Sequence, residues 1–340
     1  MKKTIVVFGA TGNQGGSVID HILSDIDLSS RYRVRAVTRN PDSQAAMNLK
    51  NRSVEIAMGD MDRPDTVERV LVDASIVFIL TTFQTTKAHE IAQGKSVADA
   101  AVANNLEYII YSTLPSVTDI SGGKYLAVEY YDSKAETEKY IRTLPVKAAF
   151  FAPGCYMQNF QNEMKPQALG DGTYGLVYPV SPQTQLPLID IAESGKFVGA
   201  ILADPDRFRG QVLSASTEVV SFEEVAQILS KSSGKTIRFE QTTEKSFRDS
   251  LPADLADTLL ETMKYFEDYG YYGPNTEGKV KETAQIAQGE LTTLQRYLER
   301  EPLELKLCYL CHYTYLFFYI ILTAYKQQAH QNKDSIIRNL

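Results

Sequence analysis

The sequence predicts an α/β protein built on a doubly wound parallel β-sheet. From the first residues onward, short apolar runs alternate with segments of helical periodicity, which is the pattern of strands joined by crossover helices. Three glycines lie between the first predicted strand and the first predicted helix, at the spacing G-x-x-G-x-x-G. We expect this sheet to be followed by a smaller mixed α/β lobe.

Length and composition are those of an ordinary globular protein. The chain has 340 residues, of which 44% are hydrophobic and 23% charged, so it can bury a sizeable core. A net charge of −7 with no basic stripe argues against direct binding of nucleic acid. Three cysteines (Cys155, Cys308 and Cys311) are too few for a disulfide framework. No apolar signal segment precedes the first strand, so we expect a cytoplasmic or a nuclear protein.

The glycine-rich turn follows a predicted strand at residues 4–8. Gly9 permits a tight turn off the strand, where a Cβ atom would clash. Gly12 lets the backbone approach a pyrophosphate, and Gly15 lets the following helix pack closely against the strand. The helix, expected to run to about residue 28, would then present free N–H groups to the phosphates. A merely structural turn is the alternative.

The end of the second predicted strand, residues 32–38, bears on the choice of dinucleotide. A carboxylate at this place would hold the 2′-hydroxyl of NAD and repel a 2′-phosphate. The chain has no acid here before Asp42, and instead has Arg39 followed by Asn40. Because a guanidinium suits a phosphate, we expect the cofactor to be NADP(H). The alternative is that Arg39 is a solvated surface arginine.

The next three predicted strands end in residues suited to line a cofactor. They are residues 54–58, followed by Gly59, Asp60 and Met61; residues 75–80, followed by Thr81, Thr82 and Phe83; and residues 107–111, followed by Ser112 and Thr113. Right-handed crossovers place the carboxyl ends of parallel strands at one edge of a sheet, where ligands bind. Asp60 has a second explanation, as the cap of a helix at residues 64–71.

A predicted helix over residues 126–143 carries Tyr130 and Lys134, which lie four residues apart and so share a face. A neighbouring lysine favours the phenolate and lowers the phenol pKa from about 10. Tyr130 would then protonate a carbonyl oxygen as hydride arrives, Lys134 would bond the nicotinamide ribose, and Ser112 or Thr113 would hold the same oxygen. The alternative is that Tyr130 is a packing aromatic.

After a strand at residues 146–152, the stretch 153–160 leaves the sheet and is expected to line the nicotinamide end of the cleft. The remaining pattern is that of a smaller lobe. Its expected elements are a turn at 170–175, a strand at 186–191, helices at 192–202, 221–231 and 254–268, and a strand at 236–240. We therefore expect a nucleotide-binding domain at 1–155, a substrate or partner lobe at 156–302 and a separate tail at 303–340.

Several of these stretches together resemble the NmrA-like family, atypical members of the short-chain dehydrogenase/reductase superfamily. The resemblance covers about residues 3–300 and is carried by residues 9–16, 37–41, 59–60, 133–136 and 153–160. It implies a Rossmann domain that prefers NADP(H). It also implies two kinds of member. Some are oxidoreductases, notably in fungal secondary metabolism, and others have lost the catalytic tyrosine and sense the NADP(H) state while binding transcription factors or other proteins.

The resemblance further implies a set of cofactor contacts. These are Gly9, Ala10, Thr11, Gly12, Asn13, Gln14, Arg39, Asn40, Asp60, Met61, Thr81, Thr82, Phe83, Lys134, Tyr156, Met157, Gln158 and Asn159. Many members lack a tyrosine four residues before the lysine, whereas this chain has Tyr130 there. That favours an oxidoreductase acting on a small carbonyl or enone, with Tyr130, Lys134 and Ser112 as the catalytic candidates. The alternative is a non-catalytic NADP(H) sensor that regulates a transcription factor or another protein.

The composition changes from Leu303 onward. Residues 307–325 carry no acidic or basic charge, and a stretch of this length is enough to span a membrane core, although its His312 and tyrosines suit an interface better. A C-terminal anchor, a docked or partner-binding helix and a gene-model artefact all stay open. Cys308, Cys311 and His312 match the c-type haem attachment signature, but such attachment needs export, and four zinc ligands are not in view. We expect no metal.

Overall fold

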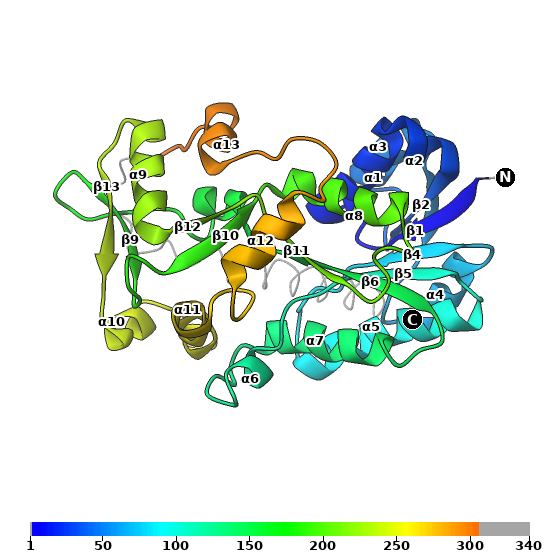
Figure 1. Ribbon diagram of the computed structural model, residues 1–340, viewed down its shortest axis with the longest axis horizontal. Helices are drawn as coiled ribbons and strands as arrows, with labels where there is room; N and C mark the ends of the chain where they lie inside the picture. The colour runs from blue at the N-terminus through cyan, green and yellow to red at the C-terminus, as the bar shows by residue number, and fades with distance from the viewer. Residues whose placement is uncertain (1, 306–340) are drawn as a thin grey trace, which may run out of the picture.

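The computed structural model describes residues 2–305, which form a seven-stranded parallel sheet with helices on both faces and a lobe with two three-stranded sheets (Figure 1). In chain order the elements are β1 (Lys3–Val7), α1 (Asn13–Ser24), α2 (Ile26–Arg31), β2 (Tyr32–Thr38), α3 (Gln44–Asn51), β3 (Glu55–Met58), α4 (Pro64–Leu71), β4 (Ile76–Ile79), α5 (Lys87–Ala103), β5 (Tyr108–Ser112), α6 (Val117–Ile120), α7 (Glu129–Ile141), β6 (Lys147–Pro153), β7 (Cys155–Tyr156), η1 (Met157–Gln161), β8 (Gln167–Ala168), β9 (Tyr174–Tyr178), β10 (Gln185–Ile189), η2 (Ile191–Glu193), α8 (Ser194–Ala203), β11 (Val212–Ala215), β12 (Glu218–Ser221), α9 (Phe222–Ser233), β13 (Ile237–Gln241), α10 (Glu244–Asp249), α11 (Ala256–Tyr269), α12 (Thr276–Ala284) and α13 (Leu294–Arg300). The predicted fold class is confirmed.

The large sheet has the strand order β11-β6-β5-β4-β1-β2-β3. Strand β1 lies between β4 and β2, with Ile5 opposite both Val34 and Ile76. The chain therefore leaves β1 in one direction and later returns to its other side, which is the topological switch point where open α/β sheets bind ligands. Because β1 is covered on both faces, its Val6 and Val7 are fully buried.

One predicted helix is two helices in the structure. The helix expected to run to about residue 28 ends at Ser24, and α2 begins at Ile26. Asp25 has extended backbone geometry, and its carboxylate accepts a hydrogen bond from the N–H of Leu28 at 2.8 Å. An aspartate in this role caps a new helix rather than continuing the old one.

Segments from beyond residue 155 return to the large sheet. Strand β11 pairs in parallel with β6, and α8 packs against α1 on one face of the sheet (Figure 1). The smaller lobe consists of the sheets β12-β10-β7 and β13-β9-β8, with α9, α10 and α11 packed around them. Its helix α9 opens with a capping box, in which Ser221 and Glu224 bond each other's backbone N–H groups.

Helices α5 and α7 pack closely at a glycine. A Cβ atom on Gly94 would lie 2.5 Å from the Cγ2 atom of Thr137, so only glycine allows this approach. One turn earlier on each helix, the same register brings Glu90 against Ser133. This contact positions the functional side chains described below.

Among residues 2–305, no helix is long and apolar enough to cross a membrane. No group of three or more histidine, cysteine or acidic side chains in this range is arranged to hold a metal ion. The segment 307–325, Cys308, Cys311 and His312 lie outside the described residues.

Candidate cofactor and active site

The glycine-rich turn has the geometry that its spacing predicts. Gly9 has a φ angle of +69°, in the left-handed region, and its carbonyl accepts the N–H of Gly12 at 3.0 Å. A Cβ atom on Gly15 would lie 2.3 Å from the Gly9 oxygen. Helix α1 begins at Asn13 without a side-chain cap, so its first N–H groups are available to an anion.

The ends of β2 and β3 form the edge of the sheet where the sequence predicts the adenosine side of the site. Arg39 and Asn40 lie directly after β2, and both are exposed. Asp60 follows β3, but it does not cap α4, whose N-cap is Arg63. The Asp60 carboxylate instead accepts the N–H of Asp62 at 3.1 Å. The capping explanation for Asp60 is therefore wrong, and Met61 beside it packs on the core.

The end of β4 and helix α7 bring Thr81 and Lys134 together. The Lys134 ammonium donates to the backbone carbonyl of Thr81 at 2.8 Å. The Thr81 hydroxyl points into the protein and donates to Glu90 at 2.8 Å. Thr82 and Phe83 follow β4 at the sheet edge, where Thr82 is exposed and Phe83 is half-buried.

Lys134 also forms an ion pair with Glu90, which the sequence analysis missed. Glu90 is fully buried, whereas 12% of the Lys134 side chain is exposed. The second carboxylate oxygen of Glu90 accepts the hydroxyl of Ser133. The sequence signal for this pair was Glu90 itself, a charged residue on the inner face of the alanine-rich helix α5. A charged residue in such a place needs a buried partner.

Tyr130 lies apart from Lys134. Its hydroxyl is 3.2 Å from the hydroxyl of Thr262 on α11, and burial raises the pKa of the phenol to about 12. This direction is opposite to the lowering expected from Lys134. The physical reason is that the Lys134 ammonium is directed at Thr81 and Glu90, while the Tyr130 ring packs into the smaller lobe. The catalytic role of Tyr130 stays a prediction.

A hydrogen-bond chain connects three predicted site residues. The Ser112 hydroxyl donates to the Gln14 amide oxygen at 3.2 Å, and the Gln14 amide nitrogen donates to the Tyr156 hydroxyl at 3.2 Å. Burial raises the pKa of Tyr156, so this phenol keeps its proton. Thr113 is directed elsewhere and donates to Glu138 at 2.8 Å. Of the two alternatives at the end of β5, Ser112 is the one bonded to Gln14 of the glycine-rich turn.

A cavity of about 250 Å³ lies beside the first turn of α1. It is lined by Asn13, Tyr156, Gln158, Asn159, Asn162, Glu163 and Ile191. Met157 is fully buried, so its side chain belongs to the core rather than to the cavity wall. Asn162, Glu163 and Ile191 were not predicted, because no motif marks them. Burial raises the pKa of the Glu163 carboxyl.

Comparison with known proteins identifies the family. The model of the NmrA-like family matches residues 1–298. The chain belongs to the NmrA-like family. Among curated relatives, an NmrA-like family domain-containing protein of Dictyostelium discoideum is 29% identical over 308 residues, covering 88% of this chain and 98% of that protein. An NmrA-like family domain-containing oxidoreductase of Penicillium ochrochloron is 27% identical, covering 70% of this chain and 76% of that protein.

The NmrA-like fold is also found among solved structures. NmrA, a negative transcriptional regulator crystallised in complex with NADP, superimposes with a TM-score of 0.73 at 24% identity, covering 89% of this chain and 95% of NmrA. Its structure in complex with NAD superimposes equally well. At this level of identity the likeness shows the fold.

Proposed function

We propose that this NmrA-like protein is an NADP(H)-dependent oxidoreductase that transfers hydride to a small carbonyl or enone substrate. The observation that carries the proposal is a convergence at the carboxyl edge of β1, β4 and β5. The uncapped N-terminus of α1, the Lys134 ammonium and the Ser112–Gln14–Tyr156 chain all meet there. Several curated relatives are named oxidoreductases, which supports the same proposed activity.

The residues present fit a dinucleotide. The open N–H groups of α1 suit a pyrophosphate, and Gly12 carries no Cβ atom that would block its approach to the backbone. Arg39 would hold a 2′-phosphate, which distinguishes NADP(H) from NAD. Lys134 would donate to the cofactor's ribose hydroxyls. When bound, the nicotinamide supplies the hydride.

The Ser112 and Tyr130 hydroxyls would be the hydrogen-bond donors to the substrate oxygen. Ser112 donates its single hydroxyl proton to Gln14 at the end of β5, so this proton would turn to the substrate oxygen when the substrate binds. Tyr130, with a pKa of about 12, is a neutral phenol at pH 7 and would donate a hydrogen bond rather than act as a phenolate base. We therefore assign proton donation to Tyr130 and the placement of the substrate oxygen to Ser112.

A second candidate function is an NADP(H) sensor that regulates a protein partner, such as a transcription factor. One observation favours it: Tyr130 is bonded to Thr262, and Lys134 is balanced by Glu90, so the two do not form an activated pair. NmrA, which shares the fold, is a negative transcriptional regulator. In this case the cofactor would bind without turning over.

The test separates binding from turnover. NADPH and NADH affinities are measured by fluorescence titration, and NADPH oxidation is then followed with a panel of aldehydes, enones and quinones. We expect turnover of at least one substrate class, with about 10²-fold slower turnover for Ser112→Ala and no such loss for the neighbouring Thr113→Val. Tight NADPH binding without turnover across the panel would support the sensor. Absence of NADPH binding would contradict both functions.

A further inference from the structure

We propose that Arg300 is a positioning residue for the cavity beside the glycine-rich turn, and that it acts through Asp190 on Gln158. The assignment of this cavity to the cofactor or substrate rests on the proposed function. The positioning itself rests on contacts within the protein, and the experiment below judges the two separately.

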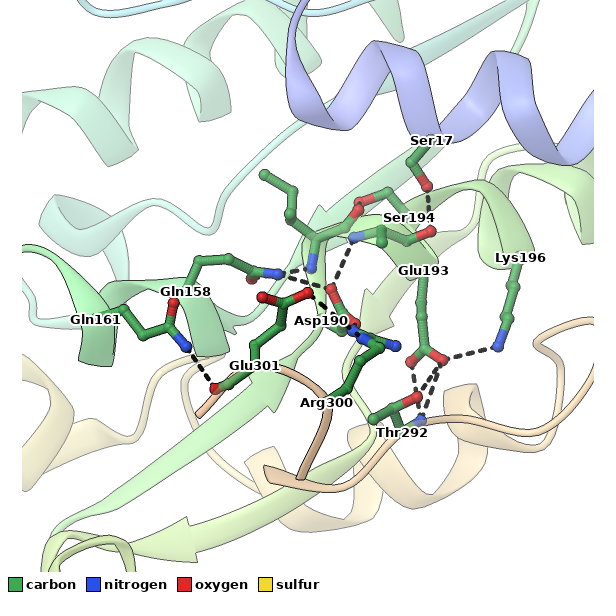
Figure 2. Close-up of polar contacts among 12 residues, drawn as sticks. Ser17, Gln158, Gln161, Asp190, Glu193, Ser194, Lys196, Thr292, Arg300 and Glu301 are labelled. Atoms are coloured by element: carbon green, nitrogen blue, oxygen red, sulfur yellow. Dashed lines mark hydrogen bonds and ion pairs between the residues drawn. The ribbon is translucent and has the colours of Figure 1, made fainter. Parts of the chain in front are cut away.

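Arg300 belongs to a segment that returns to the nucleotide-binding fold. We call residues 286–305 the C-terminal arm. After α12, the arm runs along α8 and the end of β10 before α13 reaches α9 (Figure 1). Backbone and side-chain contacts fasten it on the way. The N–H of Gln288 donates to the Lys196 carbonyl at 3.1 Å, and both the N–H and the hydroxyl of Thr292 donate to the buried carboxylate of Glu193 (Figure 2).

The centre of the arrangement is Asp190, a fully buried carboxylate that follows β10. One of its oxygens accepts the Gln158 amide nitrogen at 2.7 Å and the N–H of Ala192 at 3.0 Å. The other oxygen is paired with the Arg300 guanidinium (Figure 2). A buried carboxylate without a countercharge is costly, and Arg300 supplies the countercharge to the carboxylate that holds Gln158.

The ion pair between Arg300 and Asp190 affects the cavity because Gln158, which Asp190 holds, lines it. With its amide nitrogen bound to Asp190, the Gln158 amide oxygen accepts the N–H of Ile191 at 3.2 Å, and Ile191 lines the same cavity. The amide thus has one orientation in which both of its ends are satisfied.

The arm holds the same short helix at a second point. Gln161, at the end of η1, donates to the backbone carbonyl of Glu301 at 2.7 Å (Figure 2). Two consecutive residues of the arm, Arg300 and Glu301, therefore fix both Gln158 and Gln161. Because η1 carries Gln158 and Asn159 to the cavity, its placement sets the shape of that wall.

The chain offers a matched control on the same helix. Arg296 is a neighbouring arginine on α13 whose ion pair, at 3.5 Å, is with Glu290 on the surface. About half of the Arg300 side chain is exposed, so replacing either arginine removes little buried surface. A general effect of losing a positive charge from α13 would appear in both variants.

The experiment compares Arg300→Met, Arg300→Lys and Arg296→Met with the wild-type chain. Hydrogen–deuterium exchange of the segment 157–161 is measured without cofactor, together with NADPH affinity and the KM and kcat for NADPH. We expect Arg300→Met to raise exchange in this segment and to raise the NADPH Kd and KM about tenfold, with a smaller change in kcat. Arg300→Lys should recover part of the effect, and Arg296→Met should resemble the wild type.

A double substitution tests the route through Asp190. If Arg300 acts on Gln158 by balancing this carboxylate, Arg300→Met should change nothing further in an Asp190→Asn background. Additive effects, unchanged exchange in 157–161, or equal effects of Arg296→Met would each overturn the inference. If the wild-type chain does not bind NADPH, the proposed function is overturned. The hydrogen–deuterium exchange measurement would still decide whether Arg300 positions η1.

Discussion

The Lys134 ammonium is paired with the buried carboxylate of Glu90 across the contact between helices α5 and α7. The pair is made by close packing at Gly94, and it holds the ammonium against the Thr81 carbonyl at the end of β4. The lysine predicted to activate Tyr130 is thus a fixed positive group at the sheet edge. Its place suits a cofactor that carries hydroxyl groups and negative charge.

Replacing Glu90 with Gln is expected to destabilise the fold strongly. The substitution leaves the ammonium of Lys134 without its buried countercharge, and breaking one partner of such a pair costs about 3–5 kcal/mol. The free energy of unfolding from urea denaturation at pH 7 measures this loss. The double variant Glu90→Gln/Lys134→Met should recover much of it, because neither charge then remains buried.

Asp99→Asn is the control for the loss of a negative charge from α5. Asp99 is exposed and also contacts α7, where it accepts the hydroxyl of Tyr140. We expect a change within about 1 kcal/mol, as for an exposed pair. A loss as large as that of Glu90→Gln would show that α5 tolerates no charge removal, and would contradict a specific role for the Glu90–Lys134 pair.

Tyr130→Phe is expected to leave NADPH binding intact and to slow turnover by about 10²–10⁴-fold, the usual range for a proton donor. Steady-state kinetics on the best substrate of the panel provide the measurement. Thr262→Val is the control, because it removes the present partner of the phenol but leaves the phenol itself. Full activity of Tyr130→Phe would contradict the assigned proton donor.

The raised pKa of Tyr130 also predicts how stability depends on pH. The folded-state pKa of about 12 lies above the ordinary value of 10.0, so the folded state holds this proton more tightly than the unfolded chain. The stabilisation is complete below pH 10 and is lost as the pH rises through about 12. Wild type should therefore lose stability more steeply than Tyr130→Phe above pH 10 in denaturant titrations. Parallel curves would mean that the phenol is not desolvated.

Arg39→Asp is expected to weaken NADPH binding much more than NADH binding. The substitution removes a charge-assisted contact to a 2′-phosphate and introduces repulsion, which together correspond to about 1–3 kcal/mol. Titration of both cofactors against both proteins yields the difference directly. Equal weakening of the two cofactors would remove Arg39 from the 2′-phosphate site.

Two adjacent glycines provide a sharp test of the turn. An alanine at Gly15 would bring its Cβ atom to 2.3 Å from the Gly9 carbonyl oxygen, so Gly15→Ala should separate α1 from the turn and abolish NADPH binding. At Gly16 the nearest atom is the Ala10 oxygen at 3.9 Å. Gly16→Ala should therefore fold normally and gain up to about 1 kcal/mol of helix stability. Thermal unfolding and NADPH titration of the pair distinguish these outcomes, and equal behaviour would contradict the close approach.

Local sequence patterns predicted much of the fold, and they predicted the glycine-rich turn and the position of Arg39 in the candidate site. The strand at Tyr32–Thr38 and the helix at Pro64–Leu71 have their predicted bounds. The signals for both, strand alternation and a proline at a helix start, depend only on residues that are close in the sequence. The separate helix α2 is not predicted, because the single helix expected to run to about residue 28 includes Asp25, which caps α2. The positive φ angle of Gly9 and the exposure of Arg39 likewise follow from residue type and position.

The sequence by itself determined the alternation of strands and helices, the glycine-rich turn and the residues that follow each strand, because these depend on near neighbours in the chain. Only the tertiary structure decided which side chains meet. Glu90 reaches Lys134 across 44 positions, Ser112 reaches Gln14 across 98, and Arg300 reaches Asp190 across 110. Such partners depend on how closely two helices approach and on where the C-terminal arm returns, and no local pattern carries that information.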